Sequence, residues 1–337
     1  MIEGHGDDLF RFKGKVRINF STNIPQNVSH DRLLDHLYNC GAIFSNYPEP
    51  EPRSVERSIA KINNLSPENI IVTNGATEAI YLLAHLFMGK KSAVIAPTFR
   101  EYQDAAKVFS HSVSFIHFIN EIESCDADVI WLCNPNNPTG QVFDREKLLS
   151  VIDRCPDKVF VIDQAYSLYS VKPVLSMKDA SERKNVVILY SLTKQFMIPG
   201  LRIGYAVGPA DLFNDLRKLR MPWSVNSLAI EAAHYLLDNN DDYRIDKSVL
   251  HEEALRLSEA LRDMGMTVEQ TDCNFLLAKL SSGTAKELKE WMVENHGILI
   301  RDASNFEGLT QSHFRIAAQS REENDLFIKS MKEWISL

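Results

Sequence analysis

Lys194 lies directly after a β-rich run, Val186–Tyr190, in the segment Ser191-Leu-Thr-Lys194. A single lysine is usually a solvated surface charge, but this one lies between hydroxyl residues and a Pro-Gly turn, next to a run typical of a buried strand. An amine held there can form an imine with an aldehyde. Arg202 follows in Pro199–Gly204 and would supply a fixed cation for an anionic ligand.

A carboxylate ends a second β-rich run, Val159–Asp163, and Tyr166 follows it closely. An isolated aspartate at such a place more often caps a turn or a helix. Because Lys194 follows the next run along the chain, we expect Asp163 and Lys194 to lie at the same edge of a sheet and to serve one ligand.

Two turns add hydrogen-bond donors and acceptors. Asn134–Gly140 follows the run Val129–Cys133 and is so rich in Pro and Asn that its backbone must be fixed. It is either a rigid crossover turn or a site where the Asn137 amide binds a ligand. Thr73–Ala79 passes through glycine into a helix, and the start of a helix binds anions. The expected anion-binding residues are Gly75, Ala76 and Thr77.

These side chains together match the needs of pyridoxal 5′-phosphate. The cofactor requires a lysine for an imine, a carboxylate for its ring nitrogen, and an arginine with helix-start amides for its phosphate. Tyr166 and Asn137 would hydrogen-bond the ring 3-oxygen. The sequence therefore predicts a pyridoxal-phosphate enzyme whose catalytic residues are Lys194, Asp163 and Tyr166.

The elements that position these residues alternate between strands and helices from about residue 69 to 208. This rhythm predicts an α/β fold with a large, doubly wound and mostly parallel sheet, whose ligands gather at the carboxyl ends of the strands. Longer helices and three further strands then indicate a smaller α+β domain. We expect an N-terminal arm at 1–40, the large domain at 41–210 and the small domain at 211–337.

Composition excludes several other classes of protein. The net charge is −8, from 37 Lys and Arg against 45 Asp and Glu, and no basic run suggests nucleic-acid binding. No strand opens into G-x-G-x-x-G, so a nicotinamide oxidoreductase is disfavoured. The 5 cysteines and the histidines show no zinc-ligand spacing, and we expect no metal. Without an export signal or an apolar span, we expect a cytoplasmic protein with reduced cysteines.

The motifs occur in an order that resembles the fold-type-I, class I/II aminotransferase superfamily, over nearly the whole chain. They are Asn134-Pro-x-Asn-Pro-Thr-Gly140, Asp163-x-x-Tyr166, Ser191-x-Thr-Lys194 and Gly200-Leu-Arg-x-Gly204. The resemblance implies that Lys194 forms the Schiff base and moves protons, and that Asp163 pairs with the pyridinium nitrogen. It also places Ser191 and Thr193 beside the cofactor, and gives the cofactor phosphate to Ala76, Thr77, Ser191 and Arg202.

The same resemblance implies three longer-range roles. Phe99 would stack on the cofactor ring, although it could simply be a core residue. Arg315, in Phe314–Ala317, would clamp the substrate carboxylate, a bidentate task that suits arginine. Tyr47 would reach the cofactor phosphate of a neighbouring subunit, which implies a homodimer.

Two groups of enzymes within the superfamily compete for the reaction. Several segments, including Asn74–Glu78 and Pro222–Asn226, resemble the threonine-phosphate decarboxylases of cobalamin biosynthesis more than the histidinol-phosphate aminotransferases. The N-terminal His5-Gly-Asp-Asp differs from the decarboxylase pattern, which leaves the substrate open. Both groups act on a small phosphorylated amino compound. The candidate substrate-binding residues are His5, Ser21, Asn23, Arg301 and Arg315, with a surface ion pair as the alternative role of Arg301.

Overall fold

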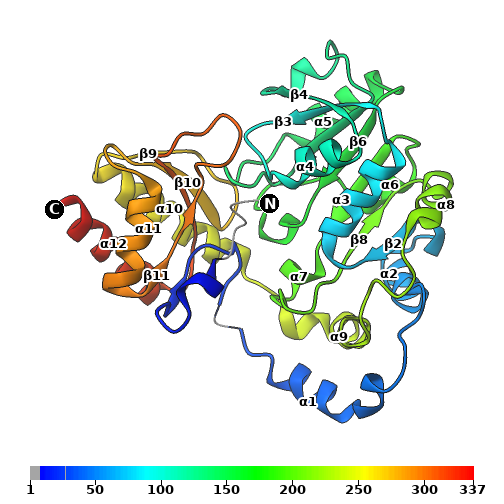
Figure 1. Cartoon of the computed structure of the whole chain (residues 1–337), viewed down its shortest axis with the longest axis horizontal. Coiled ribbons are helices and arrows are strands. Elements are labelled where there is room, and N and C mark those ends of the chain that lie inside the picture. Colours follow the sequence, from blue (N-terminus) through cyan, green and yellow to red (C-terminus); the bar gives the residue numbers. More distant parts are fainter. Residues whose placement is uncertain (1–7, 27) are drawn as a thin grey trace.

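The computed structural model describes residues 8–26 and 28–337, which form a larger and a smaller unit (Figure 1). The larger unit surrounds one sheet of seven strands in the order β2-β8-β7-β6-β5-β3-β4. Strand β8 runs antiparallel to both of its neighbours, and the other pairs are parallel. The strands are β2 (Ile70–Thr73), β3 (Lys91–Ile95), β4 (Ser112–Ile116), β5 (Val129–Cys133), β6 (Val159–Asp163), β7 (Val186–Tyr190) and β8 (Gly204–Val207).

This sheet confirms the expected doubly wound α/β architecture. Alternate residues of its central strands enter two different cores, as in a sheet covered on both faces. Helices α3, α4 and α8 cover one face, and α2, α5, α6 and α9 cover the other. The helices of this unit are α1 (Asp31–Asn39), α2 (Arg53–Asn63), α3 (Gly75–Leu86), α4 (Glu101–Val108), α5 (Arg145–Arg154), α6 (Met177–Ser181), α7 (Leu192–Gln195), α8 (Ala210–Leu219) and α9 (Ser227–Asp238).

Strand β4 was missing from the sequence prediction. It is the edge strand opposite β2, and it pairs only with β3. Its sequence, Ser112-Val-Ser-Phe-Ile116, alternates polar and apolar residues, and its first four residues are exposed or half-buried. The prediction sought continuous apolar runs, which are typical of strands buried on both faces, and so it missed an edge strand.

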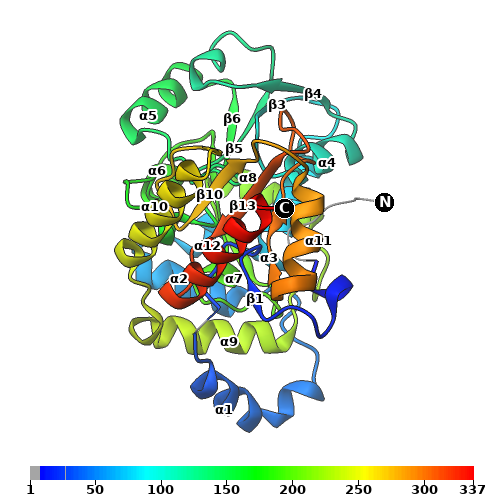
Figure 2. The same cartoon turned by 90° about the vertical axis from the view of Figure 1, so that its left-hand side faces the viewer.

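The smaller unit is an antiparallel sheet in the order β12-β13-β10-β9, with helices packed on it (Figure 2). A short parallel pair, β1 with β11, brings the N-terminal segment onto the same core. Its elements are β1 (Ile18–Asn19), α10 (Lys247–Asp263), β9 (Thr267–Val268), β10 (Phe275–Lys279), α11 (Ala285–His296), β11 (Ile298–Leu299), β12 (Arg301–Asp302), β13 (His313–Ala317) and α12 (Arg321–Ile335).

Packing refines the expected domain boundaries at 40 and 210. The side chains of Phe213 and Leu216 on α8, and of Leu236 on α9, lie in the cores of the large sheet. Phe20 instead lies in the core of the smaller unit. We therefore propose that the large domain extends through α9, and that the N-terminal segment as far as Phe20 belongs to the small domain. No helix within the described part of the chain has both the length and the apolar character to span a membrane.

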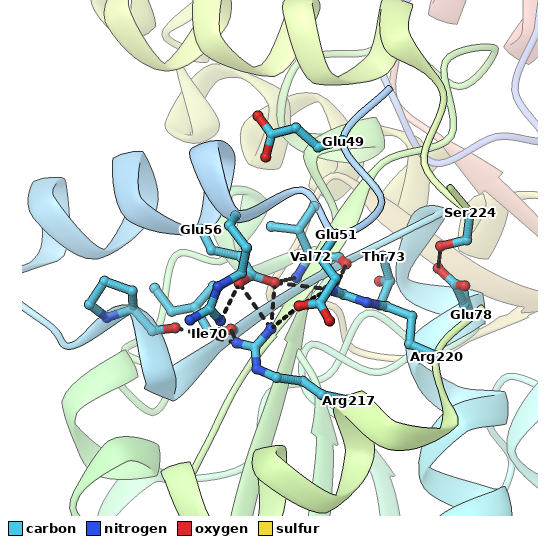
Figure 3. A network of polar contacts seen from close by, with 12 residues as sticks. Glu49, Glu51, Glu56, Ile70, Val72, Thr73, Glu78, Arg217, Arg220 and Ser224 are labelled. Atoms are coloured by element: carbon cyan, nitrogen blue, oxygen red, sulfur yellow. Dashed lines mark hydrogen bonds and ion pairs between the residues drawn. The ribbon is translucent and has the colours of Figure 1, made fainter. Parts of the chain in front are cut away.

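A buried cluster of charged side chains covers the free edge of β2 (Figure 3). Glu56 of α2 is fully buried, and its Oε1 accepts the N–H of Val72 at 3.1 Å. Arg217 and Arg220 pair with Glu56 at 3.0 and 3.2 Å, and they donate to the carbonyls of Ile70 and Val72, respectively. A strand edge otherwise presents unpaired backbone groups. The cluster thus holds β2 in place immediately before α3 begins.

Candidate active site

A cavity of about 430 Å³ lies at the carboxyl ends of β5, β6 and β7, where the two units meet. Most of the residues singled out from the sequence line it, although they come from distant parts of the chain. The lining consists of Ser21, Thr22, Ala76, Thr77, Ile80, Phe99, Tyr102, Cys133, Asn137, Asp163, Ala165, Tyr166, Ser191, Thr193, Lys194, Pro199, Arg202 and Arg315.

Lys194 extends into this cavity from the short helix α7. Its Nζ donates a hydrogen bond to the carbonyl of Thr22 at 3.3 Å and lies 5.8 Å from the centre of the Tyr166 ring. The backbone carbonyl of Lys194 accepts a 2.9 Å hydrogen bond from the hydroxyl of Tyr169, which fixes the turn. Contacts of both its side chain and its backbone therefore position Lys194 close to the end of β7, as expected.

Asp163 is a buried carboxylate at the end of β6. Its Oδ1 accepts the N–H of Ala165 at 2.9 Å, and its Oδ2 accepts the hydroxyl of Tyr102 at 2.8 Å. Burial raises the pKa of Asp163, while these two hydrogen bonds and the charge of Lys194 lower it. No ion pair to Asp163 forms among the described residues, so its charge is left for a cationic group inside the cavity.

An anion-binding cup lies at the other end of the cavity, where α3 begins. Ala76, Thr77, Ser191 and Thr193 line it, together with the half-buried guanidinium of Arg202. Arg202 donates to the carbonyl of Pro199 at 3.3 Å, and burial lowers its pKa. No carboxylate of the described residues pairs with it. A guanidinium that is not ion-paired within the described residues and lies beside helix-start amides suits a phosphate.

Two glycines allow the segments that form the anion-binding cup to pack closely together. Gly75 has a φ of +73°, and a Cβ there would lie 2.6 Å from Nη2 of Arg202. A Cβ on Gly204 of β8 would lie 2.6 Å from the backbone nitrogen of Ala76. Only glycine therefore lets the start of α3, β8 and the guanidinium approach so closely.

Arg315 is a buried guanidinium at the wall formed by the small unit. It donates one hydrogen bond to Oδ1 of Asn137 and another to the carbonyl of Ser21, whereas its Nε has no hydrogen-bond partner among the described residues. The pKa of Arg315 is lowered to about 10, chiefly by burial and to a smaller extent by the charge of Arg301. No carboxylate in the described part of the chain pairs with Arg315, which leaves it available for an anionic substrate group.

Arg301 and Asn23, two more predicted substrate residues, lie behind this wall and do not line the cavity. Arg301 is buried on β12 opposite Arg315, and its Nη2 donates to Oδ1 of Asn305 at 2.8 Å. Arg301 is therefore not a surface residue, and its predicted contact with substrate stays a prediction. Asn23 is also buried, and its carbonyl accepts from Nδ2 of Asn274 at 3.2 Å.

Two predicted residues lie elsewhere. Tyr47 is 86% exposed on the surface of the chain, where its ring packs 5.5 Å from that of Trp223. It is absent from the described residues that line the cavity of its own chain, and its contact with a neighbouring subunit stays a prediction. His5 lies outside the described residues.

Sequence reasoning missed six residues of the cavity wall, namely Thr22, Ile80, Tyr102, Cys133, Ala165 and Pro199. Tyr102 and Cys133 are buried around Asp163, and Thr22 carries the carbonyl that meets Lys194. Cys133 ends β5 directly beside Asp163 in the β5–β6 ladder, so its strand-end position could have identified it. Tyr102 is the second residue of α4, and only this place near the start of the helix, three residues after Phe99, would have suggested it.

Comparison with known proteins identifies the family. The model of the family "Aminotransferase class I and II" matches residues 17–331. The chain belongs to this family. A solved L-threonine-O-3-phosphate decarboxylase from Porphyromonas gingivalis is 37% identical, with a TM-score of 0.92 and coverage of 95% of this chain and 100% of the other.

Histidinol-phosphate aminotransferases are similar as well. The solved enzyme from Clostridium acetobutylicum is 26% identical, with a TM-score of 0.86 and coverage of 95% of this chain and 99% of the other. The enzyme from Caldanaerobacter subterraneus subsp. tengcongensis is 29% identical over 86% of this chain and 84% of its own length.

Family membership confirms that the protein is an enzyme that depends on pyridoxal phosphate. The cavity fits this cofactor on independent grounds. It combines an amine, a buried carboxylate without a cation and an anion cup that any side chain at Gly75 or Gly204 would obstruct. We propose that Lys194 and Asp163 hold the ring, that Tyr166 and Asn137 contact its 3-oxygen, and that Phe99 stacks on it.

Proposed function

We propose that the enzyme decarboxylates L-threonine O-3-phosphate. One observation carries this proposal: Arg301 and Arg315 are Cα partners in the β12–β13 ladder, and both are buried. Side chains of directly opposed residues lie on the same face of a sheet. Arg315 lines the cavity and Arg301 lies beside it, so the two positive charges together favour a substrate with two anionic groups at this wall. L-threonine O-3-phosphate has a carboxylate and a phosphate. Similarity to the Porphyromonas gingivalis decarboxylase supports the same substrate.

The alternative is a histidinol-phosphate aminotransferase, which the other similar proteins support. Histidinol phosphate carries a phosphate but no carboxylate, so it would bring only one anionic group to this positively charged wall. An amino-group donor with two carboxylates would bring two. The pair of arginines thus favours the decarboxylase, and a product analysis separates the two reactions.

The direction in which the substrate carboxylate is held decides which bond breaks. When bound, the cofactor would supply an electron sink for the breaking of a bond at the substrate Cα. If Arg315 held the carboxylate so that the bond between Cα and the carboxylate broke, CO₂ would leave and Lys194 would return a proton to Cα. If Arg315 held the carboxylate so that the Cα–H bond broke, Lys194 would remove that proton instead. Arg315 contacts Asn137 and the backbone of Ser21, so its guanidinium has a fixed direction.

Burial also affects the proton chemistry. The pKa of Tyr166 is raised to about 12, chiefly by burial, so its hydroxyl stays protonated and can donate to an oxygen of a ligand. Buried charges in the cavity act in a medium with little water, which strengthens their attraction to an anionic substrate.

Incubation of the cofactor-loaded enzyme with L-threonine O-3-phosphate, without any oxo acid, tests this function. We expect catalytic release of CO₂ and formation of 1-amino-2-propanol phosphate, both measured by mass spectrometry. Stoichiometric conversion of the cofactor to its amine form without CO₂ would assign the aminotransferase reaction instead.

Several further properties belong to this proposal. We infer that the enzyme is a homodimer in which the exposed Tyr47 reaches the cofactor phosphate of its neighbour. We also infer a cytoplasmic location and a role in cobalamin biosynthesis. Mixing a Tyr47→Phe chain with a Lys194→Ala chain would test the shared site, because one of the two cavities in a mixed dimer would then contain both intact residues.

A further inference from the structure

Three side chains that commonly bind metals lie together where α1 packs on α9, outside the cavity. His36 and Cys40 are one helical turn apart at the end of α1, and Glu231 belongs to α9. Nε2 of His36 lies 2.7 Å from Oε1 of Glu231 and 3.8 Å from Sγ of Cys40. The three ligand atoms all lie within 4.8 Å of one another.

These distances are close to those of a tetrahedral zinc site. Ligand atoms at about 2.0–2.3 Å from Zn²⁺ lie roughly 3.5 Å apart in a tetrahedron. The sulfur and nitrogen already have this spacing, and Glu231 needs only to exchange its hydrogen bond with His36 for a bond to the metal. A mixed set of thiolate, imidazole and carboxylate ligands suits Zn²⁺ better than Mg²⁺ or Ca²⁺.

We propose that His36, Cys40 and Glu231 bind Zn²⁺, with water as the fourth ligand. The side chains of His36 and Glu231 are 33% and 32% exposed, so an ion can enter from solvent without separating the helices. The ring of His36 stacks on Tyr235 with 4.5 Å between ring centres, which orients its Nε2 toward the other two ligands. Zinc would replace the proton of the Cys40 thiol.

A metal at this place would fasten α1 to α9. The chain leaves α1 at Cys40 and continues through the 3₁₀ helix Gly41–Phe44 toward Tyr47, so the metal would also restrain this segment. The sequence did not predict the site because Glu231 lies far from His36 and Cys40 along the chain, and two ligands alone do not indicate a metal.

To test the site, the full-length, cofactor-loaded enzyme is first treated with a chelator and then titrated with Co²⁺. Tetrahedral Co²⁺ bound to a thiolate absorbs at longer wavelengths than the cofactor, and Zn²⁺ should abolish this absorption. We expect one Co²⁺ per chain, and at least about tenfold weaker binding in Cys40→Ser and in His36→Gln, because loss of a ligand exceeds the effect of an outer-shell change.

Cys125→Ser is the matched control, because Cys125 is also half-buried but lies outside the cluster of His36, Cys40 and Glu231, with its Sγ donating to the carbonyl of Ile122. It should bind Co²⁺ like the wild type. Cofactor absorbance reports that each variant is folded, since none of these residues lines the cavity. Zn²⁺ should raise the Tm of the wild type and of Cys125→Ser, but not that of Cys40→Ser. Absence of Co²⁺ binding, or equal binding by wild type and Cys40→Ser, would overturn the proposal.

Discussion

The hydroxyl of Tyr102 donates to Oδ2 of Asp163 across 2.8 Å, and both side chains are buried. Burial by itself raises the pKa of this carboxyl, and the hydrogen bond from Tyr102 opposes that rise. Tyr102 thus helps to keep Asp163 ionised in a place where a carboxylate would otherwise tend to accept a proton.

We predict that Tyr102→Phe weakens cofactor binding about three- to tenfold, which corresponds to the loss of one hydrogen bond to a charged group. Without this donor the pKa of Asp163 is higher. The carboxylate is lost as pH falls through its pKa, so cofactor affinity should begin to fall at a higher pH in the variant than in the wild type. Fluorescence titration with the cofactor at several pH values measures this.

Tyr81→Phe is the control for that experiment. The Tyr81 hydroxyl donates to Oε2 of Glu101 at 3.0 Å, and Tyr81 is absent from the cavity wall. Its removal should leave the pH profile of cofactor binding unchanged. An identical shift in both variants would show that Tyr102 acts through general stability and not through Asp163.

Arg315→Lys should lower kcat/KM by about 30- to 1000-fold, since a bidentate, charge-assisted contact with the substrate carboxylate contributes about 2–4 kcal/mol. Lysine keeps the charge but cannot form the paired hydrogen bonds. Cofactor affinity should stay within about twofold of the wild type. Steady-state kinetics with cofactor saturation separates the two effects, and a loss confined to cofactor affinity would contradict the proposed role.

Gly204→Ala should damage the anion cup. Its new Cβ would lie 2.6 Å from the nitrogen of Ala76, so α3 and β8 must separate. We expect at least tenfold weaker binding of pyridoxal phosphate but little change for pyridoxal, which lacks the phosphate. Gly200→Ala is the matched control, because a Cβ there meets no atom within 4 Å. Equal losses for both ligands would show general misfolding instead of a damaged cup.

Glu56→Gln should lower the free energy of unfolding by about 3 kcal/mol, because it removes the fully buried carboxylate that Arg217 and Arg220 share. The partly exposed Glu51 is the carboxylate that still pairs with both of them in the described part of the chain. Urea denaturation of the cofactor-free chain measures this loss. Glu68→Gln removes the partially exposed partner of Arg53 and should cost less than about 1 kcal/mol. Similar values for the two variants would show that the buried cluster has no special importance for stability.

The sequence alone determined the central strands of the large sheet and most of the residues that line the cavity. Lys194, Asp163 and Asn137 each follow a continuous apolar run, and such runs become the central strands of a parallel sheet. Since the carboxyl ends of these strands meet at one edge, the position of a polar residue directly after a run was enough to place it at the site.

Only the tertiary structure decided the contacts between distant segments. The opposition of Arg301 and Arg315 depends on the register of β12 and β13, and the cluster of Glu56 with Arg217 and Arg220 depends on how α2 and α8 meet β2. Similarly, the approach of Glu231 to His36 depends on the packing of α9 against α1. The local sequence pattern predicts which face of each element is buried. It does not predict which elements become neighbours, because packing across the whole chain determines this.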